Sequence, residues 1–563
     1  MPLDTARLGL IRAALSSITR EMATDLRRAA FSSIVREARD YSVALTDARG
    51  EVIDQAECIP IMTAGISSAI RGLADAVDLS TLTEDDALLM NDPFNGGQHL
   101  QDIYLFTPVL TDGHLVAFAA SVAHHVDIGG GSPGLNATAT EIYQEGLRLP
   151  LSRFSVSRDW GRGGFVEEMV RANVRVPDLV VGDLNAQFAA NRTAAARLKE
   201  AAARFGTADC LTAMDELKDY SERRTRAALG RIPDGVYESV QTLDGSPWDA
   251  GTVDIRVRVT VAGEEIHLDF TGSGDQIDGN VNCPLASTVS SAISAVRCLL
   301  DEPDIPFNEG CNRPITVHAP FGSILNPRSP AAVRSRLTPA SRVFNAIVQA
   351  LGRQVPERAA ATGFDTTTAF TVSHLDRDTS SYQVVLEILG GGWGACAAHD
   401  GADALDNPIS NCANAPVEAL ESDYSHFRVV EYALHEHSGG TGEYRGGLGI
   451  RRTYEAVSDG VDIAGYADRH RTGAPGLDGA GPGRPGSFTI TRADGSVEQL
   501  PVVFHEKLGA GDRVSVVTGG GGGHGEPSDR AAHRIEADDR DGVASAPPRL
   551  VPRPAPSATR AVQ

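Results

Sequence analysis

Lysine is almost absent from this chain. It occurs at three positions, Lys199, Lys218 and Lys507, although Lys and Arg together number 51, so nearly all of the positive charge is carried by arginine. No GxxxxGK[ST] sequence is present, and the shortage of lysine leaves few ammonium groups that could grip a nucleotide phosphate. We therefore do not expect this chain to bind ATP by a P-loop.

Cysteine is also scarce, and long apolar runs are missing. The seven cysteines are scattered and form no CxxC pair, so a disulfide framework is not expected. No segment approaches the ~20 consecutive apolar residues of a membrane-spanning helix. Residues 1–20 are amphipathic and lack the continuous apolar centre of a signal peptide. These absences predict a cytoplasmic protein.

The charge balance is strongly acidic. The formal net charge is −23, and such a chain is repelled by nucleic-acid phosphates and by anionic membrane surfaces, which argues against both as partners. Its hydrophobic content of 42% is ordinary for a globular protein. With 563 residues, the chain can form two or more domains with ample cores.

Residues 90–150 concentrate the chemistry. They contain two His-x-x-Asp sequences, His99/Asp102 and His124/Asp127. Between these lies an apolar segment, 103–120, with Thr111-Asp112-Gly113 near its middle, and Asp-Gly between apolar runs is a strong hairpin signal. Antiparallel pairing would bring the two His-x-x-Asp sequences together at the open end of one hairpin.

This pattern has two interpretations. Imidazole and carboxylate suit Zn, Mn or Fe, and the lack of thiolates disfavours a structural zinc finger. Residues three apart on a strand point to opposite faces, so His99 and Asp102 can share an ion only if residues 98–102 form a turn. The preceding Gly96-Gly97 makes such a turn feasible. The alternative is a set of loop residues that make hydrogen bonds and caps.

The remaining pattern predicts an α+β protein of several domains, with antiparallel-rich sheets packed against helices. Apolar residues at three- and four-residue spacing predict helix over residues 4–35, and period-two alternation predicts a β-hairpin at 253–270. The expected division is an N-terminal metal-site domain at 1–230, a β-hairpin and helix domain at 231–360, a C-terminal strand-and-loop domain at 361–526, and a disordered Pro-, Ala- and Arg-rich tail at 527–563.

Several blocks carry a family resemblance. The most specific are NDPFNGGQHLQD, HHVDIGGGSPG and EIYQEGLRLP, all within residues 91–150; the others are SSIVREARDYSVALTDARG (32–50), NCANAPVEALE (411–421), SGGTGEYRGGLG (438–449) and TGGGGGHGEP (518–527). Together they closely resemble the hydantoinase B/5-oxoprolinase beta-subunit family over roughly the first 530 residues. That family includes N-methylhydantoinases, caprolactamase-type lactamases and homologous subunits of acetone and acetophenone carboxylases.

The resemblance implies a metal site with four ligands. Glu37 occupies the acidic position of the family's Glu-x-x-Asp-[Phe/Tyr]-Ser motif, whose Glu looks like a metal ligand in the carboxylase relatives. Carried over by position, the ligands are Glu37, His99, Asp102 and His124. His125 is the less favoured twin of His124, because other members can carry an aromatic residue there. Asp127 would then orient a ligating histidine.

Two glutamates are candidates for a general base. Glu141 and Glu145 lie four residues apart on an expected helix and would share one face. Either of them, or Asp127, could serve as base or orienter for a metal-activated water. The alternative is a pair of solvated glutamates.

The resemblance implies the beta-type subunit of an ATP-dependent hydrolase of cyclic amides such as hydantoins, 5-oxoproline or other lactams. In the family, ATP is used by a separate hydantoinase A-like subunit with an actin-like fold, so we expect an obligate hetero-oligomer. Phosphorylation there would activate the amide, and a divalent Zn, Mn or Fe ion here would activate water. The alternatives are a ketone carboxylase subunit, which joins a phosphorylated enol to bicarbonate-derived CO2, and a non-catalytic scaffold for the ATPase.

Overall fold

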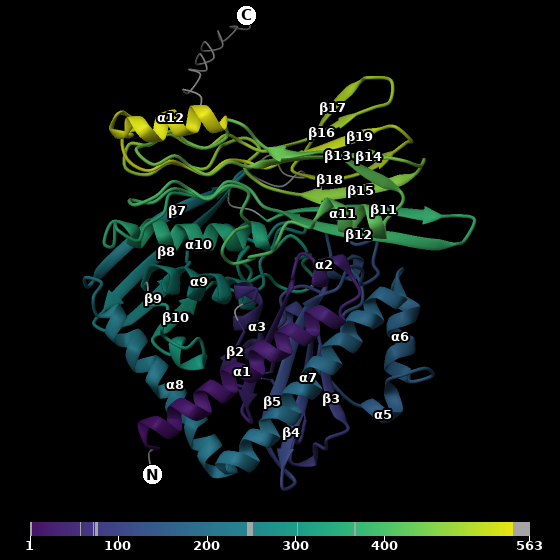
Figure 1. Ribbon diagram of the computed structural model, residues 1–563, viewed down its shortest axis with the longest axis vertical. Helices are drawn as coiled ribbons and strands as arrows, with labels where there is room; N and C mark the ends of the chain where they lie inside the picture. Colours follow the sequence, from purple (N-terminus) through teal and green to yellow (C-terminus); the bar gives the residue numbers. More distant parts are fainter. Residues whose placement is uncertain are drawn as a thin grey trace, which may run out of the picture.

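The computed structural model describes residues 3–56, 58–70, 72–73, 77–244, 251–300, 302–364 and 367–543. Their strands form sheets of six, four, four and five strands, with helices packed against the first two (Figure 1). This arrangement confirms the expected α+β class. Each sheet draws its strands from only one of the three expected segments, while the boundaries of the domains themselves remain a prediction.

The N-terminal sheet holds the His-x-x-Asp hairpin. Its strands are β1 (Tyr41–Asp47), β2 (Val52–Gln55), β3 (Asp86–Met90), β4 (Asp102–Thr111), β5 (His114–His124) and β6 (Ser152–Ser155). They pair antiparallel in the order β2-β1-β5-β4-β3-β6. Helices α1 (Thr5–Ala29) and α7 (Pro177–Phe205) pack together, and α7 lies against β4 and β5 (Figure 1).

The hairpin of β4 and β5 forms as the sequence predicts. Asp112 and Gly113 both have positive φ, 51° and 77°, as a tight hairpin turn between right-twisted strands requires. The register that follows from this turn pairs Asp102 with His124 at the open end. The prediction that pairing brings the two ends together is therefore confirmed.

The N-terminal helix is shorter than predicted. Asp4 caps α1 by accepting from the Arg7 N–H, and the buried face of the helix follows the expected apolar spacing. The helix ends at Ala29 because the N–H groups of Phe31 and Ser32 bond to Asp183 Oδ1, at 2.7 and 3.1 Å, on the neighbouring α7. A separate short helix, α2 (Ser33–Arg36), follows.

The central segment is a second sheet covered by helices. Its strands are β7 (Gly235–Leu243), β8 (Val253–Ala262), β9 (Glu265–Asp269) and β10 (Ile315–His318). The N-terminal segment also contains the helices α3 (Pro60–Ile70), α5 (Val156–Asp159), α6 (Phe165–Asn173) and α8 (Thr207–Leu229). The central segment contains α9 (Leu285–Leu300) and α10 (Leu337–Gly352). The predicted hairpin is β8 and β9. One continuous apolar core runs through both segments, with α3 packed on β1 and on α9.

The C-terminal segment stacks two antiparallel sheets over this body (Figure 1). One sheet consists of β11 (Thr368–Asp376), β12 (Ser381–Leu389), β15 (Val461–Tyr466) and β18 (Val503–Leu508); the other consists of β13 (Phe427–Leu434), β14 (Ile450–Ala456), β16 (Ser487–Thr491), β17 (Val497–Leu500) and β19 (Arg513–Val517), and a short helix, α11 (Val417–Asp423), precedes β13. A second apolar core fills the space between the sheets, with Phe370 from one and Phe488 from the other.

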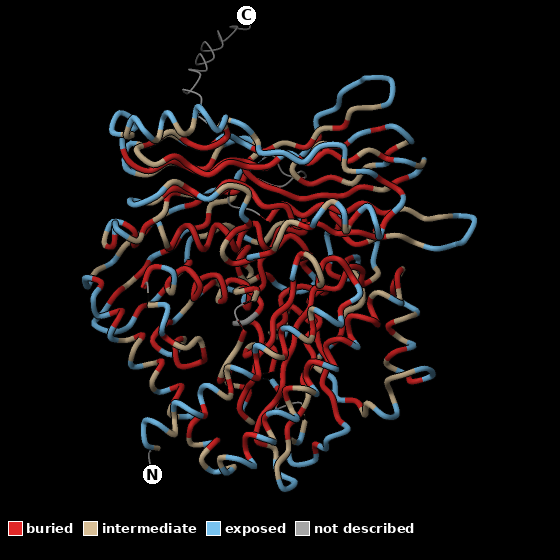
Figure 2. The backbone as a smooth tube through the Cα atoms, in the orientation of Figure 1, coloured by how far each residue is buried: buried red, intermediate tan, exposed pale blue. Residues whose placement is uncertain are grey.

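The glycine-rich runs of this segment are buried rather than mobile loops (Figure 2). Gly440 donates to Gly521 O at 2.8 Å, and Gly521 donates to Gly447 O at 3.0 Å. A Cβ at Gly392 would lie 2.0 Å from Gly447 O, so only glycine permits these backbones to approach so closely.

Part of the expected disordered tail is folded. Residues Ala532–Asp541 form a helix, α12, and Asp538 on it pairs with Arg530 at 2.6 Å and with Arg445 at 3.3 Å. These contacts attach α12 to the glycine-rich layer, which is why a segment with no apolar face still folds. The rest of the predicted tail, residues 544–563, lies outside the described residues.

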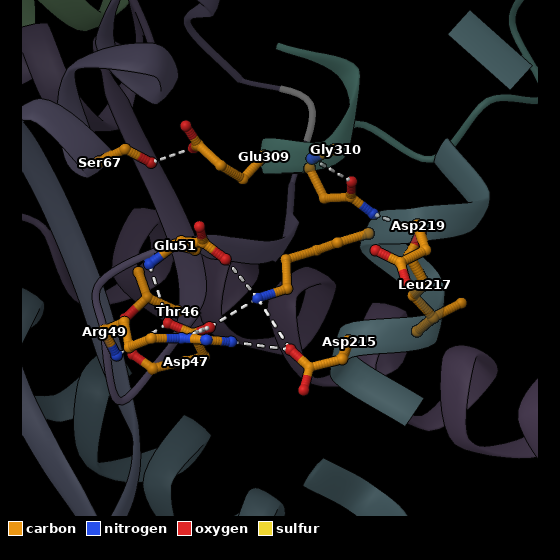
Figure 3. Close-up of polar contacts among 12 residues, drawn as sticks. Thr46, Asp47, Arg49, Glu51, Ser67, Asp215, Leu217, Asp219, Glu309 and Gly310 are labelled. Carbon is orange, nitrogen blue, oxygen red and sulfur yellow. Dashed lines mark hydrogen bonds and ion pairs between the residues drawn. The ribbon is translucent and has the colours of Figure 1, made fainter. Parts of the chain in front are cut away.

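A buried lysine joins the N-terminal sheet to α8. Lys218 has no exposed side-chain surface, and its ammonium contacts Asp47 at 2.6 Å, Glu51 at 2.5 Å and Asp215 at 3.2 Å. Figure 3 shows the carboxylates of Asp47, Glu51 and Asp215 converging on Lys218 from a hairpin and a helix.

In the described part of the chain, no helix combines the length and the apolarity needed to cross a membrane.

Candidate metal site

Three of the predicted ligands meet at the open end of the hairpin. His99 precedes β4, Asp102 begins β4, and His124 ends β5. Each of the three residues offers one possible ligand atom, and these three atoms all lie within 4.8 Å of one another. All three residues are buried, with at most 3% of their surface exposed. The turn that this geometry requires is present, since Asp102 N donates to His99 O at 3.1 Å.

The glycine pair before His99 makes this turn possible. Gly96 has a φ of +99°, in the region that glycine occupies without strain. A Cβ at Gly97 would lie 2.7 Å from Asp92 O, closer than any side chain allows. The local sequence thus folds the chain so that residues three apart face the same point.

Unsatisfied atoms at this point fit a divalent ion. His99 Nε2, Asp102 Oδ1 and His124 Nδ1 are all buried without a hydrogen-bond partner, although the first two lie only 3.0 Å apart. Each such atom costs about 1–3 kcal/mol if nothing binds it. A cavity of about 10 Å3, roughly the space that one water-sized species needs, borders both histidines. Two imidazoles and a carboxylate are ligands suited to Zn, Mn or Fe.

Both histidines are held in the neutral form that binds metals. Burial, followed by the charges of Arg336 and Arg334, lowers the pKa of His99 well below its ordinary value. The pKa of His124 is lowered in the same way, by burial first and then by Arg334. Because neither imidazole takes up a proton near neutral pH, an incoming cation meets no competition from protons.

Two buried arginines surround the group, and the sequence analysis missed both. Arg336 Nη2 donates to Asp102 Oδ2 at 2.6 Å, and Arg336 Nη1 lies 2.9 Å from His99 Nδ1. The Arg334 carbonyl oxygen lies 3.4 Å from the same Nδ1. Because guanidinium nitrogens only donate, His99 Nδ1 accepts the hydrogen bond from Arg336 in this structure. No local motif marks these residues, which lie more than 230 positions from His99 in the sequence.

Asp40 is a third residue that the sequence analysis missed. It lines the same small cavity, and its carbonyl oxygen accepts the His124 N–H at 3.0 Å. Burial and the nearby Asp102 raise the pKa of Asp40 to about 8, so its carboxylate is favoured only beside a cation. The sequence feature that could have identified Asp40 is the Glu-x-x-Asp-Tyr-Ser motif, in which Asp40 follows Glu37 by three residues.

The structure does not bring Glu37 to the metal group. Its carboxylate pairs with Arg36 at 2.7 Å, and its side chain lines a large open groove instead of the small cavity. His125 also faces away, since its Nε2 lies 3.1 Å from Gln187 Oε1 on α7. The preference for His124 over His125 therefore agrees with the strand geometry.

The three predicted catalytic carboxylates have different surroundings. Asp127 accepts from Arg175 N at 2.5 Å and from Arg175 Nη1 at 3.2 Å, so it anchors a loop. The expected helix carrying Glu141 and Glu145 is absent, because only Ile142–Gln144 form a single 3-10 turn. Glu141 is exposed and Glu145 is buried, so the two do not share a face.

Comparison with known proteins agrees with this geometry. The sequence model of the Hydantoinase B/oxoprolinase family matches residues 4–527. The chain belongs to this family. Among its relatives, the B-type subunit of a putative D-/L-hydantoinase from Pseudomonas sp. (strain NS671) is 32% identical over 96% of this chain and 93% of its own length. The caprolactamase beta subunit of Pseudomonas jessenii is 31% identical over 96% and 94%.

Solved structures share the fold of this family member. The crystal structure of the ATP-dependent caprolactamase from Pseudomonas jessenii matches with a TM-score of 0.87 and 29% identity, over 96% of this chain and 94% of that one. An acetone carboxylase structure matches with a TM-score of 0.88 at 18% identity, over 96% of this chain and 78% of that one, which shows the fold alone. The chain spans only 42% of the length of the 5-oxoprolinase of Pestalotiopsis fici, to which it is 30% identical.

Glu145 makes the stability of this family member depend on pH. Its Oε1 accepts the backbone N–H groups of Val333 and Arg334 at 2.9 and 2.8 Å, while Oε2 is buried without a partner. Burial raises the pKa of Glu145 to about 8, against the opposing effect of these donors. The folded chain therefore keeps a proton that the unfolded chain releases above pH ~4.3. Stability is fully present below that pH and falls as the pH rises towards 8.

Glu145→Gln is expected to remove this pH dependence. Glutamine keeps the acceptor for both N–H groups but cannot ionise, so the variant should have its smallest advantage over the wild type at pH 5, the lowest pH measured. Its advantage should then grow by up to about 1.4 kcal/mol per pH unit towards pH 8. Unfolding of both proteins by urea at pH 5, 6, 7 and 8 measures this. A constant difference between the two proteins at every pH would contradict it.

Proposed function

We propose that this chain is the beta-type subunit of an ATP-dependent hydrolase of cyclic amides. The observation that carries the proposal is the convergence of His99, Asp102 and His124, each of which has a buried side-chain atom without a hydrogen-bond partner, in a family member. Relatives named as subunits of a hydantoinase and a caprolactamase support this class of substrate. ATP is used by a hydantoinase A-like partner with an actin-like fold, in a hetero-oligomer.

The two subunits divide a difficult reaction. An unstrained amide is a poor electrophile, because its nitrogen delocalises into the carbonyl group. Phosphorylation of the carbonyl oxygen in the partner activates the ring. Overall, one ATP and two waters are consumed, one to release the phosphate and one to open the ring, and the ring-opened acid, ADP and phosphate are released. A divalent Zn, Mn or Fe ion held by His99, Asp102 and His124 would supply the Lewis acidity that makes water a nucleophile near neutral pH.

The residues around the group have distinct roles in this proposal. Asp40 supplies the second carboxylate of the group, after Asp102, and lines the cavity of the two histidines. Arg334 and Arg336 place two fixed positive charges beside it, where negative charge develops on the substrate oxygen during attack. Glu145 positions Arg334 through the backbone, and Asp127 holds the loop after β5. Glu141 is exposed and has no part in the chemistry.

Reconstitution with an actin-like ATPase subunit tests the proposal. The complex is incubated with ATP and with hydantoin, 5-oxoproline or caprolactam, and ring opening is followed together with metal content. We expect ATP-dependent ring opening that is lost after chelation and restored by Zn, Mn or Fe. Incorporation of 13C-bicarbonate into a ketone product, without ring opening, would instead establish the carboxylase alternative and overturn the proposal.

A further inference from the structure

A large groove beside the metal site is lined by arginines. It has a volume of about 1080 Å3 and lies between α1, the segment 36–41 and the loops near residues 305 and 412. We call it the arginine groove, after the six arginines that line it: Arg12, Arg20, Arg27, Arg28, Arg36 and Arg39. Such a concentration is unexpected in a chain whose net charge is −23.

Four of these arginines form no ion pair within the described residues. In the part of the chain that the structure describes, Arg12, Arg20, Arg28 and Arg39 make no ion pair and no side-chain hydrogen bond. Of the other two arginines in the groove, Arg36 is neutralised by Glu37 and Asp423 at 2.7 and 2.6 Å. Glu37, Asp54 and Asp304 also line the groove, and Asp54 interacts electrostatically with Arg12 and Arg20. Six arginines against three carboxylates still leave an excess of positive charge, which a bound anion offsets.

Only a thin wall separates the arginine groove from the metal site. Three segments form this wall, and in each of them neighbouring residues face opposite sides. Arg39 and Tyr41 line the groove, whereas Asp40 between them lines the cavity of His99 and His124. In the same way Cys58 and Asn411 line the groove, whereas Ile59 and Ser410 line the cavity.

Resting on the proposed function, we propose that the arginine groove binds the phosphate group of the activated substrate that the partner subunit makes. Guanidinium groups match phosphate oxygens by paired, charge-assisted hydrogen bonds, and several of them can share one phosphate. The volume suits a small molecule, and the groove shares the wall at Asp40 with the cavity of His99 and His124. The substrate class is thus a phosphorylated cyclic amide.

The overall charge of the chain favours direct transfer from the partner over capture from solution. A phosphorylated anion released into bulk solvent is repelled by a net charge of −23. Local guanidinium groups offset this repulsion only within the groove. Direct transfer from the partner's site to the groove also keeps the phosphorylated intermediate away from bulk water, which would hydrolyse it.

A matched pair of triple variants of this subunit, each assembled with the ATPase subunit, tests the inference. The groove variant is Arg12→Gln/Arg20→Gln/Arg39→Gln. The control is Arg223→Gln/Arg353→Gln/Arg377→Gln, which removes three exposed arginines that also lack ion pairs within the described residues and lie outside the groove. Both triple variants lower the net charge by the same amount, so a difference in phosphate binding between them reflects the location of the arginines and not the total charge.

Equilibrium dialysis with 32P-labelled inorganic phosphate measures the groove independently of ring opening. We expect the wild-type and control complexes to bind phosphate alike, and the groove variant to bind it at least tenfold more weakly. In turnover, the groove variant should keep its metal content and ATP hydrolysis but open at least tenfold fewer rings per ATP. Equal phosphate binding by all three complexes overturns the inference.

Two further outcomes separate this inference from its alternatives. If the groove variant no longer assembles with the ATPase, the arginines dock an acidic surface of the partner, and the inference is wrong. If the phosphate difference is found but even the wild-type complex opens no ring, the groove is an anion site and the proposed function fails on its own.

Discussion

Replacing His99 and His124 together by alanine is expected to abolish both metal binding and ATP-dependent ring opening. The two imidazoles supply two of the three converging ligand atoms, and the remaining Asp102 is already bound by Arg336. A single carboxylate does not retain a divalent ion against water. The loss of activity should be at least roughly 1000-fold, equivalent to about 4 kcal/mol of transition-state stabilisation.

Elemental analysis of the purified chain, wild type beside the double variant, provides the measurement. His125→Ala is the matched control, because His125 is the adjacent buried histidine but faces Gln187 across the strand. It should cost stability while leaving the metal content unchanged. A wild-type chain that is purified without chelator, contains no ion and recovers none on addition would contradict the ligand assignment. The cluster would then be a polar structural feature, and the scaffold alternative would gain support.

Lys218→Met is expected to lower the free energy of unfolding by about 3–5 kcal/mol. Methionine matches the length of lysine but carries no charge, so the Asp47 carboxylate, with 8% of its side chain exposed, loses its buried cation and keeps only the exposed Arg49 at 3.4 Å. Burial alone raises the pKa of Asp47, but the hydrogen bond and charge of Lys218 and two backbone donors lower it below its ordinary value. The stabilising contribution is therefore present above pH ~4 and is lost as the pH falls below that value.

Two controls identify the buried charge as the cause. Lys218→Met/Asp47→Asn removes both partners and should recover part of the lost stability, because no uncompensated charge remains. Lys199→Met removes a lysine that is 37% exposed and paired with Glu84, and should cost at most about 1 kcal/mol. Urea unfolding at pH 7 compares the variants. A double variant that is as unstable as Lys218→Met would show that the loss comes from packing rather than from charge.

Short-range signals in the sequence were enough to predict the local part of the site. The Asp112-Gly113 turn set the register of β4 and β5, and the register paired Asp102 with His124. Gly96 and Gly97 allowed the turn that joins His99 to Asp102. These features depend on backbone conformations that few residues adopt, so a few positions specify them. The helical spacing of α1 was equally readable, apart from its last turn.

The charged residues that surround the site depend instead on the tertiary fold. Arg334 and Arg336 come from a segment more than 230 residues away, and no local pattern distinguishes them from the many other arginines. The choice of Asp40 over Glu37 depended on which side of a thin wall each residue faces. The predicted helix at Glu141 and Glu145 failed because Glu145 bonds to the distant backbone of Val333 and Arg334. Contacts between segments far apart in sequence leave no periodic signal in either segment, and it is these contacts that fix burial, charge and access at the metal group.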